Sequence, residues 1–304
     1  MRTPPPQWLQ VSAEVQQALL AGTPVVALET TVITHGLPRP ANLEMGLALE
    51  EEVRRAGAVP ATVGVVEGQV RVGLTRAELE RLAATQEVVK VSRRDLGVVR
   101  ARRQDGGTTV AATMLAAHAA GIRLLATGGI GGVHRGQGGD VSADLPELAR
   151  TPVAVVCSGA KSVLDLPRTL EWLETAGVPV LGWRTDDFPA FFWRSSGLPV
   201  SARVDDATSA AVVLEAHWSA GLESGVVISV PCPEAETVPH QQVEAALAEA
   251  IASAEQAGIR GKDLTPFLLA RLAERTGGTT LRANLALLRN NARVAAEIAW
   301  ALAG

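Results

Sequence analysis

The sequence contains no tyrosine, two cysteines and few lysines, and these shortages exclude several classes of protein. Cys157 and Cys232 form no CxxC pair, and a chain of 304 residues needs no disulfide to stabilise its core. The formal net charge of −4 leaves no basic excess for a nucleic-acid partner. No apolar run reaches the roughly 18 residues that span a bilayer, and residues 1–6 contain no apolar segment typical of a secretory signal. We therefore expect a cytoplasmic protein without nucleic-acid or membrane partners.

The scarcity of lysine directs attention to the lysines that remain. Only three of the 28 basic residues are lysines, namely Lys90, Lys161 and Lys262. Arginine can replace lysine as a generic cation, but only the amine of lysine has an accessible neutral form that adds to a carbonyl. The three lysines are therefore candidates for covalent chemistry, and chance retention of any one of them is the competing explanation.

Short runs rich in β-branched residues alternate with longer helical patterns as far as Val230. Most runs are continuously apolar, which predicts strands buried on both faces of a mainly parallel sheet in an α/β fold. A turn at residues 67–69 between two apolar runs predicts one antiparallel pair, and therefore a mixed sheet. Strands are expected at residues 25–30, 62–66, 88–92, 123–127, 153–157, 178–182 and 226–230, and helices at residues 42–56, 75–84, 108–120, 164–176 and 207–220.

The C-terminal part of the sequence has a different pattern. Residues 241–302 are predicted to form consecutive helices, with breaks at Gly261 and at Gly277 and Gly278. No flexible linker precedes them, so we expect these helices to cover the sheet. The sequence therefore predicts a single domain over residues 1–304, with residues 1–10 as an extended N-terminal arm.

Ligands in open α/β sheets bind beyond the carboxyl ends of the strands, so the residues that follow each predicted strand are candidates for a site. Glu29 ends the first strand, where partial burial would raise its pKa and suit proton transfer. Capping of the next turn is the alternative role. Gly106, Gly107, Thr108 and Thr109 precede a predicted helix, whose free amides and hydroxyls would form a phosphate cradle. An ordinary helix N-cap explains the same residues.

A glycine-rich segment at residues 128–139 follows the fourth predicted strand and does not fit a dinucleotide-binding fingerprint. Asp140 and Asp144, on either side of Ser142, offer hard oxygen ligands for Mg²⁺ or Mn²⁺ with several waters retained. His134 has no second histidine nearby in the sequence, so we interpret it as a structural hydrogen-bonding residue.

Lys161 follows the fifth predicted strand, and its small neighbours Gly159 and Ala160 leave room for a substrate at its amine. A lysine at a strand end in an α/β protein is suited to forming a Schiff base. An exposed lysine at the start of a helix is the alternative. Cys157 is not expected to act as a nucleophile, because the sequence shows no histidine–carboxylate partnership for it.

Longer motifs across nearly the whole chain, from near residue 8 to residue 302, resemble the pseudouridine-5′-phosphate glycosidase family, also called the indigoidine-synthase-A-like family. The motifs are ALETT at 27–31, ITHG at 33–36, KVSRRDL at 90–96, GGTTVAAT at 106–113, ATGGIGGVHRG at 126–136, SADL at 142–145, GAKS at 159–162, TPFLLA at 265–270 and NNA at 290–292. The resemblance implies reversible cleavage of the C–C glycosidic bond of pseudouridine 5′-phosphate to uracil and ribose 5-phosphate, which is the pseudouridylate synthase reaction of a lyase.

The resemblance also implies a three-layer α/β/α fold with a mixed, mainly parallel sheet and a helical C-terminal region, a homotrimer, and a divalent metal, usually Mn²⁺, with Mg²⁺ as the alternative. A C-glycoside has no electronegative leaving atom, so the paired-carboxylate route of ordinary glycosidases suits it poorly. Opening of the ribose ring and capture of C1′ on a lysine amine would give an iminium-linked path by which the uracil carbon departs.

Matched position by position, the resemblance implies that Glu29 is the proton donor and Lys161 the nucleophile. Asp140 matches the metal-binding aspartate, which holds the ion largely through waters. The expected substrate-binding residues include the cradle residues from the strand-end argument; they are Lys90, Thr108, Thr109, Val110, Ser142, Ala143, Asp144 and Asn284.

Three departures from the family pattern are visible. The loop at residues 136–139 is shorter than in many relatives, Ser158 replaces an alanine that is common before Gly-Ala-Lys, and VPCP at 230–233 replaces the usual Asn-Pro-Ile-Pro. None of them removes a catalytic candidate. Two alternatives stay open, a Schiff-base aldolase that acts on another sugar phosphate and a non-catalytic protein that binds sugar phosphates. Release of uracil from pseudouridine 5′-phosphate would distinguish a glycosidase of this family from the aldolase and from the binding protein.

Overall fold

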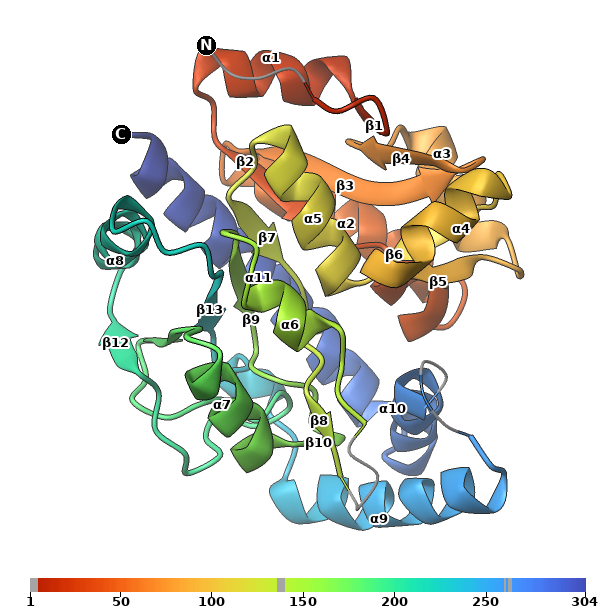
Figure 1. Cartoon of the computed structure of the whole chain (residues 1–304). Coiled ribbons are helices and arrows are strands. Elements are labelled where there is room, and N and C mark those ends of the chain that lie inside the picture. Colours follow the sequence, from red (N-terminus) through yellow and green to blue (C-terminus); the bar gives the residue numbers. More distant parts are fainter. Residues whose placement is uncertain (1–4, 136–139, 260, 262–263) are drawn as a thin grey trace.

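An 11-stranded mixed sheet forms the centre of the computed structural model (Figure 1), which describes residues 5–135, 140–259, 261 and 264–304. The main order is β1-β4-β3-β2-β7-β9-β13-β11-β12, and β6 joins through β3 and carries β5. From β3 to β12 every neighbouring pair is parallel, whereas β4 and β6 are antiparallel to β3. The bounds are β1 Leu9–Val11, β2 Val25–Leu28, β3 Val59–Val66, β4 Gln69–Val72, β5 Val89–Val91, β6 Gly106–Thr108, β7 Leu124–Ala126, β9 Ala154–Cys157, β11 Val180–Trp183, β12 Ala202–Val204 and β13 Val226–Ser229.

The predicted strands are confirmed, with small shifts at their ends. The central strands β2, β7, β9 and β13 are buried at every residue, as their continuously apolar sequences require. The predicted hairpin is also confirmed, because Val66 pairs with Gln69 across β3 and β4. Its turn is one residue shorter than predicted and consists of Glu67 and Gly68, whose φ angles of 53° and 78° twist the chain as a two-residue hairpin requires.

Helices cover both faces of the sheet. Figure 1 shows α5 and α6 in front of the central strands and α11 behind them, and α11 also packs against α2 and α8. Among the described residues, no helix combines the length and the apolar character that a membrane crossing would need. The helix bounds are α1 Ala13–Ala21, α2 Ala41–Arg55, α3 Arg76–Ala84, α4 Leu96–Ala101, α5 Val110–Ala120, α6 Asp144–Leu148, α7 Leu166–Thr175, α8 Ala207–Ser219, α9 His240–Gln256, α10 Leu264–Arg275 and α11 Thr279–Ala303.

The prediction was wrong at the start of the helix expected over residues 108–120. Residues Gly106–Thr108 form strand β6, and α5 begins only at Val110. A β-carbon on Gly107 would lie 2.1 Å from Thr34 Oγ1, so the strand fits only because this residue has no side chain. A strand of two glycines and a threonine has no apolar pattern, which is why its sequence did not indicate it.

The first strand and the C-terminal helices both pack in the α/β fold. Near the N-terminus, Leu9–Val11 is an edge strand parallel to β4, so the expected arm ends in the sheet. Beyond Val230, the predicted helices are confirmed as α9, α10 and α11, and Gly277 and Gly278 separate the last two.

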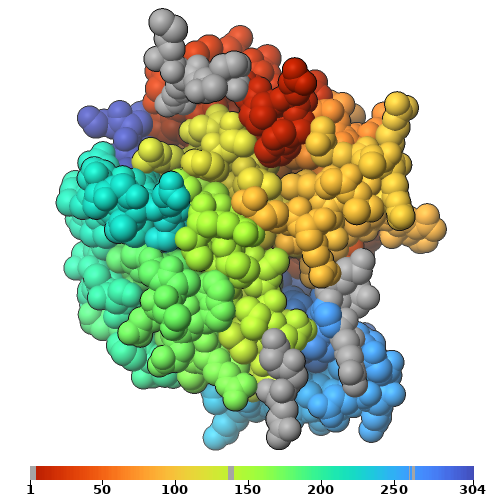
Figure 2. All heavy atoms as spheres, viewed as in Figure 1, coloured from red at the N-terminus to blue at the C-terminus, as the bar shows by residue number. Residues whose placement is uncertain are grey.

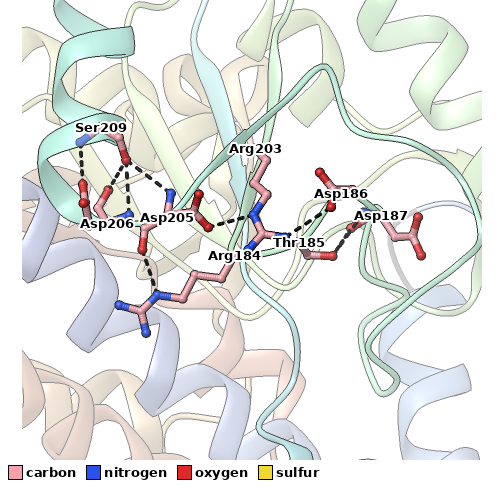
Figure 3. Close-up of polar contacts among 8 residues, drawn as sticks. All are labelled: Arg184, Thr185, Asp186, Asp187, Arg203, Asp205, Asp206 and Ser209. Atoms are coloured by element: carbon pink, nitrogen blue, oxygen red, sulfur yellow. Dashed lines mark hydrogen bonds and ion pairs between the residues drawn. The ribbon is translucent and has the colours of Figure 1, made fainter.

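The long connection from β11 to α8 is organised by an exposed arginine–aspartate network (Figure 3). Arg203 donates to Asp205 at 2.7 Å and to Asp186 at 3.2 Å, and Arg184 donates to the backbone oxygen of Asp205 at 2.9 Å. Asp206 then caps α8 by accepting the backbone N–H of Ser209 at 2.7 Å. Because these ion pairs are solvent-exposed, each contributes little to stability.

Candidate active site

A cavity of about 300 Å³ opens beyond the carboxyl ends of the central strands. Most of the predicted site residues line it, together with Thr265 of α10. A smaller cavity of about 50 Å³ shares Glu29, Lys90 and Lys161 with the first and extends to Asn284 of α11. In the space-filling view the yellow and orange surface of residues near 75–105 lies above the blue surface of α9 and α10 (Figure 2). The residues that line the larger cavity come from segments far apart in the sequence, from Glu29 to Thr265. The predicted residues that line the larger cavity are Glu29, Lys90, Thr109, Val110, Asp140, Ser142, Ala143, Asp144 and Lys161.

Glu29 is held at the end of β2 with its carboxyl group buried. Oε1 accepts the Thr127 hydroxyl at 2.9 Å, and Oε2 accepts the Val32 amide at 3.2 Å in the π-helical turn Val32–Gly36. Burial raises the pKa of Glu29, opposed by Lys161 and by the Thr127 hydroxyl. The sequence left two alternative roles for Glu29, a cap of the next turn and a buried acid. In the structure the side chain both caps the turn and is buried.

Lys161 lies on the loop that leaves β9, in the same cavity as Glu29. Its backbone N–H donates to Ile130 O at 3.1 Å, and Ile130 N–H donates to Gly159 O at 3.1 Å, so the loops after β7 and β9 run side by side. Gly159 has φ of 81°, and a β-carbon there would lie 2.3 Å from Pro189 O. The small residues beside Lys161 are thus required for the backbone as well as leaving space at the amine.

Arg135 also holds the loop that contains Lys161. Its guanidinium donates to the backbone oxygens of Ser162 at 3.1 Å and Leu164 at 3.2 Å. It also makes a two-pronged ion pair with Glu244 of α9, at 3.0 and 3.1 Å. Short strands β8 (Val133–His134) and β10 (Leu164–Asp165) pair beside it. The Lys161 loop is therefore fixed at both of its ends.

Asp144 occupies part of the phosphate cradle that the sequence predicted. Its Oδ1 accepts the Ala111 amide at the start of α5 at 2.9 Å, and its Oδ2 accepts the Gly131 amide at 2.8 Å. The Thr109 hydroxyl caps the same helix by accepting the Ala112 amide at 3.4 Å. Among the described residues the Val110 amide has no hydrogen-bond partner, so this donor of the first turn is left for a ligand.

Thr108 is a correction to the predicted substrate-binding set. Its side chain is fully buried and its hydroxyl donates to Val63 O at 2.7 Å. The same hydroxyl accepts the Thr113 hydroxyl at 2.9 Å, while the Thr108 backbone N–H donates to Thr30 Oγ1 at 2.9 Å. Thr108 therefore ties β6 to β3 beneath the site and has no hydroxyl proton left for a ligand.

His134 lines the cavity, although its sequence context suggested a structural role. Burial lowers the pKa of its imidazole; Asp140 raises it, and Lys161 and Lys90 lower it further. The ring is thus within electrostatic reach of the proposed catalytic and metal-binding groups. A lone histidine gave no sign of this in the sequence, because the loops that bring these residues together are separated along the chain.

Arg93 bonds to a residue that is distant in the sequence. It makes a two-pronged ion pair with buried Glu147 of α6, at 2.6 and 2.5 Å. The Thr151 hydroxyl also donates to Glu147, at 2.6 Å. This pair joins the segment that follows Lys90 to the helix that begins at Asp144.

The residues available to a divalent cation are few. Asp140 is exposed at the cavity, its backbone oxygen accepts the His134 amide at 2.9 Å, and its carboxylate has no hydrogen-bond partner among the described residues. Both oxygens of Asp144 are already used by backbone amides. In the part of the chain that the structure describes, no three His, Cys, Asp or Glu side chains converge. This donor set fits an ion held by one carboxylate, waters and a substrate phosphate, which is usual for Mg²⁺ and suits Mn²⁺.

Two features from the sequence analysis lie outside the described residues. They are the loop at 136–139, where a departure from the family was noted, and Lys262.

The two cysteines are expected to be chemically inert in the folded protein. Burial raises the pKa of the Cys157 thiol to about 12 and that of the Cys232 thiol to about 11. The thiolate is the reactive form, and neither group forms it near neutral pH. Iodoacetamide at mildly alkaline pH should therefore leave the native protein unmodified, whereas both thiols should be alkylated after denaturation. Mass spectrometry distinguishes the outcomes, and rapid native alkylation of Cys157 would reopen its exclusion as a nucleophile.

The fold and the cavity define a class of protein: an α/β protein with a buried acid and a lysine amine facing one cavity at the carboxyl ends of parallel strands. The family model for indigoidine synthase A-like proteins matches residues 14–301. The chain therefore belongs to the indigoidine synthase A-like family.

Relatives over nearly the full length carry one name. The chain is 58% identical to a protein named pseudouridine-5′-phosphate glycosidase from Roseiflexus, covering 97% of this chain and 96% of the relative. It is 52% identical to one of the same name from Caldanaerobacter subterraneus, covering 96% of each chain. Two solved structures superpose with TM-scores of 0.90. One is the prealnumycin C-glycosynthase AlnA in complex with ribulose 5-phosphate (45% identity, 98% of each chain), and the other is an indigoidine synthase A-like protein from Thermotoga maritima (38% identity, 97% of each chain).

Proposed function

We propose that the protein catalyses the reversible cleavage of the carbon–carbon glycosidic bond of pseudouridine 5′-phosphate, giving uracil and ribose 5-phosphate. The observation that carries this proposal is a single cavity in which the buried acid Glu29 and the amine of Lys161 interact electrostatically, beside a second lysine, Lys90. The name shared by the full-length relatives supports the same substrate. The ribulose 5-phosphate bound to the similar C-glycosynthase supports a sugar phosphate as the ligand class.

The first step of the proposed mechanism opens the ribose ring. The C1′–O4′ bond breaks, its electron pair goes to O4′, and Glu29 supplies the proton that O4′ takes up. A carboxyl group with a raised pKa keeps this proton near neutral pH, and burial provides that condition. The uracil ring stabilises the electron-poor C1′ by releasing its N1 proton.

The second step transfers C1′ to Lys161. The neutral amine forms a bond to C1′ and releases a proton, after which C5 of the uracil ring takes up a proton. The C1′–C5 bond then breaks, its electron pair returns to the ring, whose N1 takes back a proton to give uracil, and the nitrogen lone pair forms a C1′=N iminium. Water hydrolyses the iminium to free the lysine and ribose 5-phosphate, so that the net reaction consumes one water.

The phosphate is proposed to bind between Lys90, the Val110 amide and Ser142. Lys90 and Ser142 line the cavity, and Val110 has the available amide at the start of α5. Because Asp144 already accepts the next amide of that helix, the helix terminus alone is a weaker anion site than the sequence predicted. Lysine charge therefore carries more of the phosphate binding in this proposal.

Turnover of pseudouridine 5′-phosphate is the direct test of the function. Uracil should appear in equal amount to ribose 5-phosphate when the reaction is followed by chromatography. Unphosphorylated pseudouridine should have a kcat/KM lower by about 10²-fold or more, because phosphate binding energy orients C1′. An aldolase would leave the C-nucleotide intact and cleave another sugar phosphate, and a binding protein would return it unchanged. Equal specificity constants for nucleoside and nucleotide would refute the phosphate assignment.

We also propose that a divalent cation, Mn²⁺ or Mg²⁺, binds through the Asp140 carboxylate. When bound, the ion would supply positive charge that offsets the charge of the substrate phosphate. Asp140→Ala should lower kcat/KM by about 10- to 100-fold without changing the melting temperature, because the residue is exposed. Excess chelator should have the same effect on the wild-type protein and little on the variant. Full activity in chelator would refute the metal requirement. The homotrimer implied by the family resemblance and the cytoplasmic location expected from the composition stay predictions.

A further inference from the structure

Asn291 of α11 is a fully buried polar residue that the mechanism above does not use. Its amide nitrogen donates to Thr127 O at 2.9 Å and to Ser158 Oγ at 3.1 Å, with a longer contact of 3.4 Å to Gly128 O. Its amide oxygen lies 3.3 Å from the Ser158 hydroxyl, which donates to it. The C-terminal helix thus reaches through the core to the ends of two central strands.

Each partner of Asn291 is adjacent to a catalytic candidate. Thr127 is the residue whose hydroxyl donates to Glu29 at 2.9 Å. Ser158 begins the loop that leads to Lys161, and its backbone N–H donates to Gly128 O at 2.8 Å. One side chain therefore bonds to both of the loops that bring the acid and the amine to the same cavity.

We propose that Asn291 is a positioning residue that aligns the Thr127–Glu29 hydrogen bond with the Lys161 loop. The proposal rests on the proposed function only for its kinetic readout, because the alignment itself is a property of the free protein.

The side chain of asparagine suits this position for a chemical reason. Two backbone oxygens and a hydroxyl surround it, so the position needs a neutral group that donates more than one hydrogen bond and also accepts one. Aspartate could only accept, and its charge would face the oxygens of Thr127 and Gly128. Alanine would leave Thr127 O and the Ser158 hydroxyl buried with fewer partners, so the two loops would move to regain hydrogen bonds.

A movement of the two loops would change the pKa of Glu29, because this pKa depends on the groups around its carboxyl. Burial raises the pKa of Glu29 most; Lys161 and the Thr127 hydroxyl lower it, Asp144 raises it, and the Val32 amide lowers it. Lys90 lines both cavities beside them. Loss of Asn291 is expected to weaken the Thr127 hydrogen bond and so raise the pKa of Glu29 further, while Asp144 keeps its own amide partners.

The chain provides a matched control at the neighbouring position. Asn290 is on the same helix but is partly exposed, and its amide oxygen accepts Arg293 at 2.9 Å. Asn290→Ala therefore makes the same chemical change without touching the strand ends. Thr127→Val is a second comparison, because it removes the hydroxyl on Glu29 and keeps the backbone oxygen that Asn291 contacts.

The test measures the titration of Glu29 by NMR of ¹³C-labelled glutamate carboxyls, with the resonance identified by its absence in Glu29→Gln. Asn291→Ala and Thr127→Val should both move the titration to higher pH, and the double variant should move it no further than Thr127→Val alone. Asn290→Ala should leave it unchanged. With pseudouridine 5′-phosphate, Asn291→Ala should lower kcat by about tenfold or more, with KM changed less than about threefold.

Each outcome decides the proposal. An Asn291→Ala protein that folds, with an unmoved titration and wild-type kcat, would overturn it, as would an equal effect of Asn290→Ala. If Asn291→Ala does not fold, Ser158→Ala removes the hydroxyl partner alone, and an unmoved Glu29 titration there would overturn the proposal. If the wild-type protein releases no uracil, the proposed function fails, while the NMR titration still tests Asn291.

Discussion

Lys161→Arg is expected to be as inactive as Lys161→Ala in the turnover of pseudouridine 5′-phosphate, with kcat reduced on the order of 10³-fold or more. Arginine keeps the positive charge and approximately the length of lysine, but it has no accessible neutral amine to bond to C1′. A lysine that only bound phosphate would tolerate this change much better. Steady-state kinetics of the two variants against the wild-type protein therefore separates a nucleophile from a cation.

Chemical trapping identifies the lysine directly. Borohydride added with ribose 5-phosphate should reduce the iminium to a stable secondary amine, and peptide mass mapping should locate the added mass on residue 161. Lys90→Arg is the matched control, because Lys90 also lines the cavity. That variant should still form the adduct while its KM for the nucleotide rises. An adduct on Lys90 or Lys262, or an active Lys161→Arg protein, would show that another lysine is the nucleophile.

The strand-end argument brought most of the candidate residues to one cavity, because it depends only on the order of strands and helices. Glu29 follows β2 and Lys161 follows β9, and both strands were recognisable from continuous apolar runs. Parallel strands present their carboxyl ends at one edge, so residues separated by more than a hundred positions meet in one cavity. No contact had to be known for that prediction.

Predictions that depended on the direction of one side chain were less successful. Thr108 was expected to bind a ligand, and its hydroxyl donates to Val63 O because β6 pairs with β3, a strand pairing that two glycines conceal. His134 was interpreted as structural because no second histidine is nearby in the sequence; it lines the cavity, and its structural role stays a prediction. Asn291 contacts Thr127 over a separation of 164 positions, which no local pattern indicates.

Replacement of Glu29 by glutamine should remove the proton donor and leave the fold intact. Glutamine is close in size: its amide oxygen can accept the Val32 amide and its NH2 can donate to the Thr127 hydroxyl oxygen, at the positions where the wild-type carboxyl group accepts these two groups at 3.2 and 2.9 Å. We expect kcat to fall by about 10²- to 10⁴-fold, the usual contribution of general acid catalysis. Wild-type kcat should fall as pH rises through the raised pKa of Glu29, because only the protonated carboxyl donates.

The same substitution has an opposite effect on stability, and the sign follows from the burial. Because burial raises the pKa of Glu29 in the folded protein, the fold favours the protonated carboxyl. The stability this provides is fully present below the pKa of the unfolded chain and is lost as pH rises through the folded value. Glu29→Gln cannot ionise, so its free energy of unfolding should exceed that of the wild type at neutral pH and approach it in acid. Urea unfolding at a series of pH values measures this difference. A Glu29→Gln protein that is active, or that is less stable than the wild type at neutral pH, would mean that Glu29 is ionised in the fold and does not donate the proton.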